Sequence, residues 1–151
     1  MYTDSSSFHL PDPERQPEFY ADVPAKRLLA FVVDTVLILL LTLGLVLFTA
    51  GLAIFVFLPL WWVLNFAYRY VTLARGSATW GMRLFAIEFR DARGQSLDQT
   101  TAFLHTLGFM LSCTFLPLQA ISIVLMLTDP AKQGLTDKFL GTVAMNRRAG
   151  Y

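Results

Sequence analysis

Asp34 is the residue whose type and position most clearly suggest chemistry. It is the only charged residue in the 41 residues between Arg27 and Arg69. It follows Arg27 by seven positions, which on a helix is about 10 Å and nearly the same face. A carboxylate within an apolar helix costs up to about 3 kcal/mol on membrane-insertion scales. Two roles follow for Asp34: a titratable or ion-binding site, or a structural ion pair between two helices.

Arg69 is the first candidate partner for Asp34, because it lies at a comparable depth in the second half of the same apolar stretch. Arg27 suits Asp34 less well, since its side chain leans towards the amino terminus and the lipid headgroups. Asn65 lies one helical turn before Arg69. It could approach the same site or form an ordinary helix–helix hydrogen bond.

Three further residues are candidates for polar contacts. His105 lies in an apolar stretch. It could be a neutral histidine that hydrogen-bonds to a neighbour, or it could be part of a proton relay. Asp137 could cap the turn that follows it, or pair with Arg83 or Arg27 at the membrane surface. The sequence shows no nucleophile–base pair, phosphate-binding glycine loop or paired acid–base carboxylates. It therefore predicts no enzymatic activity.

Composition excludes several classes of protein. Only 15% of the residues are charged and the mean hydropathy is +0.52, whereas a soluble domain has about 25% charged residues. The net charge of +1 gives no reason to expect a nucleic-acid partner. One cysteine, Cys113, and two histidines predict neither a disulfide nor a metal or cofactor site. We expect a small integral membrane protein in contact with the lipid bilayer.

The gaps between charged residues define the helices that position these side chains. A membrane-spanning helix needs about 20 apolar residues. The first gap therefore predicts two transmembrane helices, over residues 24–49 and 52–73, joined by a very short turn. Pro59 is expected to kink the second helix.

The second gap, residues 99–128, contains Pro117, which biases Leu116 away from helical geometry. It predicts either one long kinked helix or a broken segment, as a re-entrant hairpin or two short helices, that turns near 112–117. All 12 Lys and Arg residues lie before or at the start of the first helix, at or after the end of the second, or near the end of the chain. Basic segments stay in the cytoplasm, and only the broken segment keeps all three there.

The segments outside the helices predict a small cytoplasmic β element. Residues 81–90 alternate with a period of two, which is typical of a strand, and 91–94 follow as a turn. Residues 142–146 form a second candidate strand, and pairing the two would stabilise both. An amphipathic interfacial helix is the alternative for 81–90.

The fold class is therefore an all-α membrane protein with two full transmembrane helices, a Pro-broken third segment and a two-stranded β element. Residues 1–23 are polar and rich in proline, so they are expected to be a disordered or extended cytoplasmic tail. No signal peptide is expected, because no apolar core follows a basic start. Residues 24–146 form the membrane domain, and 147–151 a second tail.

Three motifs resemble the RDD family of small bacterial membrane proteins, over about residues 24–146. That family is named for an arginine at the start of its first helix, an aspartate within that helix and a second aspartate. Arg27 and Asp34 match the first two, within Ala-Lys-Arg-Leu-Leu-Ala-Phe-Val-Val-Asp. Asp137 matches the last, within Gly-Leu-Thr-Asp-Lys-Phe-Leu-Gly-Thr-Val.

A middle stretch, Thr79-Trp-Gly-Met-Arg-Leu84, is similar to the family's Thr-Pro-Gly-Lys-Arg-Leu. Trp80 and Met82 depart from that pattern, and His105 stands where many members carry an arginine. The resemblance implies a membrane protein of the bacterial inner membrane, and transport of unidentified ligands has been suggested for the family.

Two functions are consistent with these observations. The first is a non-enzymatic accessory, assembly or scaffold subunit that docks onto a larger inner-membrane complex, because the chain is short for a complete transport path. The second is a small oligomeric transporter or ion exchanger that uses intramembrane Asp34, since broken helices and ionisable residues at mid-depth are transporter traits. Both predict a multi-pass protein whose amino and carboxyl termini lie in the cytoplasm, with a membrane-protein partner or a second copy of the chain.

Overall fold

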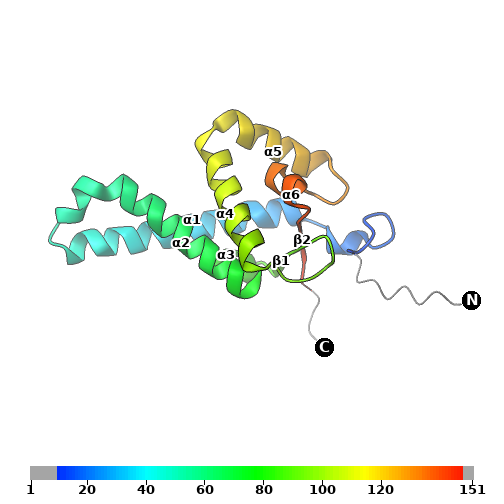
Figure 1. Cartoon of the computed structure of the whole chain (residues 1–151), viewed down its shortest axis with the longest axis horizontal. Helices are drawn as coiled ribbons and strands as arrows, with labels where there is room; N and C mark the ends of the chain where they lie inside the picture. Colours follow the sequence, from blue (N-terminus) through cyan, green and yellow to red (C-terminus); the bar gives the residue numbers. More distant parts are fainter. Residues whose placement is uncertain (1–9, 148–151) are drawn as a thin grey trace, which may run out of the picture.

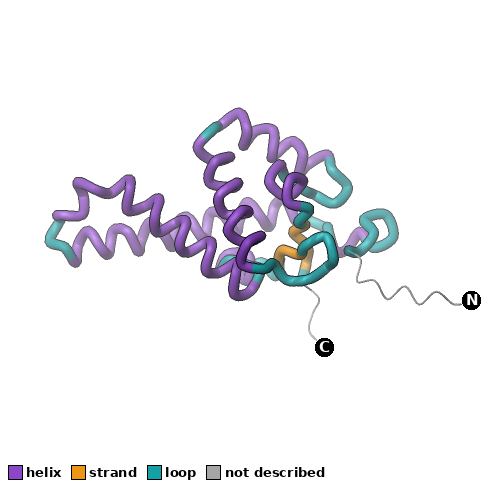
Figure 2. The backbone as a smooth tube through the Cα atoms, in the orientation of Figure 1, coloured by secondary structure: helices purple, strands orange, loops and turns teal. Residues whose placement is uncertain are grey.

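A computed structural model of the chain describes residues 10–147, and it is mostly helical (Figures 1 and 2). Two long helices form a hairpin, and the shorter elements gather beside one end of it (Figure 1). The helices are α1 (Val23–Phe48), α2 (Phe57–Gly76), α3 (Trp80–Leu84), α4 (Gln99–Thr114), α5 (Leu116–Thr128) and α6 (Leu135–Leu140), with 3-10 turns η1 (Pro17–Phe19) and η2 (Leu52–Val56), and the strands are β1 (Ile87–Arg90) and β2 (Val143–Asn146).

The hairpin of α1 and α2 confirms the prediction of two helices long and apolar enough to cross a membrane within the described residues. Helix α1 lies within one residue of its predicted bounds. Its turn needs no charged residue, because Ala50 and Gly51 adopt positive φ and the Gly51 N–H donates to the Val46 carbonyl. The Thr49 hydroxyl also accepts from the Ala53 N–H. The turn thus satisfies its own backbone groups.

The predicted kink at Pro59 within the second helix is wrong. The chain forms the 3-10 turn η2 first, and α2 begins only at Phe57. Pro59 therefore falls in the first turn of α2, where a missing N–H breaks no helical hydrogen bond. The helix continues to Gly76, three residues beyond the predicted end, and stops where Ser77 takes a left-handed conformation.

The third apolar segment is broken, and the chain bends by 115° between α4 and α5. The break is the extended residue Phe115. Leu116 already belongs to α5, so the expectation that it is non-helical is wrong by one residue. Pro117 lies in the first turn of α5, a position that suits proline. Helix α5 leads back to α6, which packs beside α4 (Figure 1).

Residues 81–90 are a strand only in their second half. Thr79 caps α3, accepting from the Met82 N–H, and Ala86 has a positive φ that separates α3 from β1. The predicted pairing of the two strands is confirmed: β1 and β2 are antiparallel, with Ile87 opposite Asn146. Hydrogen bonds between residues 91 and 95 close the predicted turn after β1.

The described part of the amino-terminal segment contains the 3-10 turn η1 and contacts the rest of the fold. Tyr20 is buried, and its hydroxyl donates to the Pro11 carbonyl. The Asn146 amide on β2 donates to the carbonyls of Glu18 and Ala21. The two Asn146 contacts join positions more than 120 residues apart in the sequence, which composition cannot reveal. Residues 1–9 and 148–151 lie outside the described part of the chain.

The buried core lies at the end of the hairpin where the short elements gather. It includes Val23 and Ala30 of α1, Leu73 of α2, and Phe89 of β1. The opposite end of the hairpin is different: Phe48 and Phe55 are 89% and 87% exposed. Such apolar exposure suits lipid or another helix rather than water.

Candidate functional site

Asp34 is held by three donors from two other elements. It is only 7% exposed. The Tyr68 hydroxyl on α2 donates to Oδ1 at 2.6 Å, and the Thr79 hydroxyl donates to Oδ2 at 2.6 Å. The Gly81 N–H on α3 donates to Oδ1 at 2.8 Å. The carboxylate therefore ties α1 to α2 and to the start of α3.

The predicted ion pair between Asp34 and Arg69 is not formed, since no salt bridge within 4.0 Å joins them in residues 10–147. Adjacent helical residues point in different directions, so Tyr68 faces Asp34 while Arg69 faces α4. The guanidinium of Arg69 lies 3.7 Å from the ring centroid of Phe109. Arg69 is 8% exposed, and its Nε has no hydrogen-bond partner within the described residues.

Gly81 lets α3 approach α1 closely. A Cβ atom at this position would collide with the Ala30 carbonyl and lie 2.8 Å from Asp34 Oδ1. A side chain there would push α3 away and lengthen the hydrogen bond to Asp34. The glycine of the Thr-Trp-Gly-Met-Arg-Leu stretch is thus part of the Asp34 site.

Asp137 is the centre of a second buried polar cluster. It is fully buried, and it accepts from Arg27 Nη1 at 2.5 Å and from His105 Nε2 at 2.8 Å. It also accepts from the Thr142 hydroxyl and the Gly134 N–H. Of the two cations considered as partners for Asp137, Arg27 is the one that pairs with it. The Gly134 bond helps to cap the start of α6, whereas the sequence suggested a cap on the turn after Asp137.

The Asp137 cluster keeps the carboxylate ionised. Burial alone would raise the pKa of Asp137, but the Arg27 charge and the His105 hydrogen bond hold it well below its ordinary value. The His105 ring also packs against Phe89, with centroids 4.3 Å apart. Its Nδ1 has no hydrogen-bond partner in the described residues. The neighbour to which His105 bonds is therefore Asp137.

Two candidate residues lie outside both clusters. Arg83 is exposed, and its Nε donates to the Ala78 carbonyl at 3.3 Å rather than pairing with Asp137. Asn65 is not among the hydrogen-bond donors to Asp34 in the described residues; it lines a pocket. The neutral donors to Asp34 were not predicted from the sequence, because the prediction relied on the positions of charged residues and these hydroxyl and N–H groups are uncharged. Glu88, a buried carboxylate that pairs with Arg90 on the same strand, was not predicted either.

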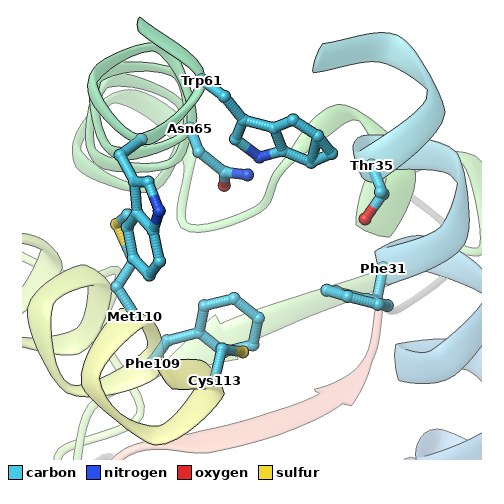
Figure 3. Close-up of a pocket in the computed structure, with 8 residues that line it drawn as sticks. Phe31, Thr35, Trp61, Asn65, Phe109, Met110 and Cys113 are labelled. Carbon is cyan, nitrogen blue, oxygen red and sulfur yellow. The ribbon is translucent and has the colours of Figure 1, made fainter. Parts of the chain in front are cut away.

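The pocket lies between α1, α2 and α4 and has a volume of about 170 Å³. Figure 3 shows aromatic rings around it, with the Thr35 hydroxyl and the Asn65 amide directed towards its interior. Its lining residues are Phe31, Thr35, Trp61, Trp62, Asn65, Phe109, Met110 and Cys113. Cys113 is thus one of the residues that form the wall of the pocket. Among residues 10–147, no three His, Cys, Asp or Glu side chains group as metal ligands.

Comparison with known proteins places these clusters in a family. Neither the curated proteins nor the solved structures contain a match to this chain. The family model for the RDD family matches residues 22–141, a range that contains Arg27, Asp34 and Asp137. It also contains the pocket and most of the helical structure. The chain is a membrane protein that belongs to the RDD family.

Proposed function

We propose that this protein is a non-enzymatic accessory, assembly or scaffold subunit that docks onto a larger complex of the bacterial inner membrane. The observation that carries the proposal is that both aspartates are bound by donors of the chain itself. Asp34 accepts three hydrogen bonds, and Asp137 is enclosed by Arg27, His105 and Thr142. An ionised carboxylate has about four acceptor positions, of which most at Asp34 and all at Asp137 are taken by groups that connect helices.

The topology that we propose has α1 and α2 crossing the membrane and α4–α5 entering and returning on the cytoplasmic side. The pairing of β1 with β2 supports it, because the chain before α4 and the chain after α6 then meet on one face. The basic residues of these segments would face the cytoplasm, as positively charged loops do. Both termini lie there in this arrangement.

Cysteine labelling tests the topology. Single cysteines replacing Gly94 and Gly150 in a Cys113→Ser background are expected to react only from the cytoplasmic side. A cysteine replacing Gly51, in the turn of the hairpin, serves as the control for the opposite side. Labelling of the Gly94 and Gly150 positions from opposite sides would exclude the re-entrant arrangement.

The distal part of the hairpin supports docking onto a partner. Residues 43–58 carry large exposed apolar side chains, among them Leu47, Phe48 and Phe55. In a membrane, such a surface packs against lipid or against another protein's helix through van der Waals contacts. We propose that a helix of the partner complex occupies part of this surface.

One observation favours the alternative of a small oligomeric transporter. Arg69 is a buried cation without a carboxylate within 4.0 Å in residues 10–147, and it stacks on a ring that lines the pocket. The pocket also reaches Cys113, close to the break between α4 and α5. Broken helices and intramembrane charges are features of transporters.

Purification and flux measurements distinguish the two functions. As an accessory subunit, the protein is expected to copurify in mild detergent with a stoichiometric larger complex and to show no flux alone in proteoliposomes. Asp34→Asn is then expected to weaken folding or assembly. If Asp34→Asn instead abolishes ion- or pH-dependent flux while folding and assembly remain intact, the accessory function is wrong.

A further inference from the structure

The pocket between α1, α2 and α4 has the composition of a binding site for a small molecule. Four aromatic side chains surround it, and none of its lining residues is acidic. Its volume of about 170 Å³ is close to that of an engineered apolar protein cavity of about 150 Å³ that binds benzene. A benzene-sized apolar body therefore fits between the rings.

Two polar groups in the pocket have no protein partner. The Thr35 hydroxyl and the Asn65 side-chain amide make no hydrogen bond within the described chain, whereas Thr42 and Thr72 donate to carbonyls of their own helices. Both groups face the same space (Figure 3). Unpaired polar groups at mid-depth in a membrane helix are costly, and a ligand acceptor would satisfy both.

Arg69 adds a positive charge next to the pocket: it is not a lining residue, but it stacks on one. It follows Asn65 by one turn of α2, and its guanidinium lies 3.7 Å from the centroid of Phe109, a lining ring. Asp34 is within electrostatic range of Arg69, but its oxygens are already occupied by Tyr68, Thr79 and Gly81. The cation therefore keeps unused donors, and one of them, Nε, is buried without a partner in residues 10–147.

We propose that this pocket binds a small organic carboxylate with a benzene-sized apolar body. The ring would pack between Trp61 and Phe109, and the carboxylate would accept hydrogen bonds from Thr35 and Asn65 while Arg69 balances its charge. A cation would meet no acidic lining side chain, and a neutral apolar ligand would leave the polar groups unsatisfied. This inference does not depend on the accessory function.

Tryptophan fluorescence tests the site directly. The chain has three tryptophans, and two of them line the pocket. A Trp80→Phe background therefore reports on the pocket alone. With full-length protein in detergent at neutral pH, benzoate is expected to give a saturable change. Benzamide, which has nearly the same shape but no charge, is expected to bind at least about tenfold more weakly, a difference of about 1.4 kcal/mol.

Wall variants separate the pocket from partitioning into detergent. Asn65→Leu and Thr35→Val remove hydrogen-bonding groups that have no partner in the described chain, so both proteins are expected to fold. Asn65→Leu and Arg69→Gln are each expected to weaken benzoate binding at least about tenfold. The proposal is overturned if benzoate gives no saturable change, if benzamide binds equally well, or if folded Asn65→Leu binds benzoate like the parent.

Discussion

The backbone N–H of Gly81 donates to the carboxylate of Asp34 at 2.8 Å, across 47 positions of sequence. The bond forms only because Gly81 has no side chain, since a Cβ there would meet the Ala30 carbonyl. The hydrogen bond to Asp34 and the lack of a side chain at Gly81 thus hold α3 against α1. The same contact sets the position from which β1 starts.

Gly81→Ala is expected to destabilise the protein by about 1–3 kcal/mol, the usual range for overpacking a tight contact, and by more if the Asp34 hydrogen bond is lost. Thermal unfolding in detergent measures the effect. Gly44→Ala is the matched control, because a Cβ at Gly44 has no atom within 4 Å. Equal melting temperatures for the two variants would contradict the close approach of α3.

Tyr68→Phe removes one of the three donors to Asp34. Because hydrogen bonds to a charged group contribute about 1.5–3 kcal/mol, the variant should lose a large part of that value. Tyr70→Phe, two residues along α2, provides the control: its hydroxyl has no hydrogen bond in the described structure. Its ring stacks on Phe66 and meets Phe103 edge to face, and the variant keeps both contacts. A loss of similar size in both variants would count against the Asp34 site.

Asp137 is expected to make stability depend on acidic pH. Its folded-state pKa lies below the ordinary value of 3.8. The stability from this carboxylate is therefore fully present above the unfolded value and is lost as pH falls towards the folded one. Chemical unfolding from neutral to strongly acidic pH should show this slope in the parent protein and a weaker slope in Asp137→Asn.

The neutral-pH effect of Asp137→Asn is also large, because it leaves Arg27 without its partner. Breaking a buried ion pair costs about 3–5 kcal/mol. Asp129→Asn is the control, since its partner Lys138 is 38% exposed and such surface pairs contribute about 0–1 kcal/mol. Equal losses in the two variants would show that the Asp137 cluster is not buried as described.

Arg69→Met is expected to leave stability unchanged or to raise it. The guanidinium has no hydrogen bond within the described residues and stacks only on Phe109. Replacing a buried charge with an apolar side chain of similar length is often neutral or stabilising by about 1–4 kcal/mol. Thermal unfolding of Arg69→Met, with Arg69→Ala as the variant that leaves a cavity, measures this. A marked loss in Arg69→Met would assign Arg69 a structural role.

The helical hairpin and the strand pairing could be predicted because each depends on a pattern that extends along the sequence. Hydropathy placed α1 within one residue, and a period of two identified β1. Helix α3 was covered only by the alternative of an interfacial helix over 81–90, because five residues are too few for a helical period to show. Its start depends on one capping bond at Thr79.

The partners of the two aspartates were predictable to different degrees. Arg27 was one of two cations considered as the partner of Asp137. The partner had to be a cation on the same side of the membrane, which left few candidates. For Asp34, the same reasoning selected the nearest cation in depth, Arg69. That prediction was wrong because depth alone does not decide which groups reach the carboxylate. The side of α2 on which Tyr68 lies matters, and so does the fold of the segment that carries Thr79.

The long sequence separation of the contacts at the base of α1 has a consequence for synthesis on the ribosome. Arg27 is bound by a residue 110 positions later, and Lys26 by a residue 120 positions later. Both helices of the hairpin emerge well before either partner exists. The first helix is therefore made before these partners exist, and its base can reach the folded arrangement only after residues 137–146 have been synthesised.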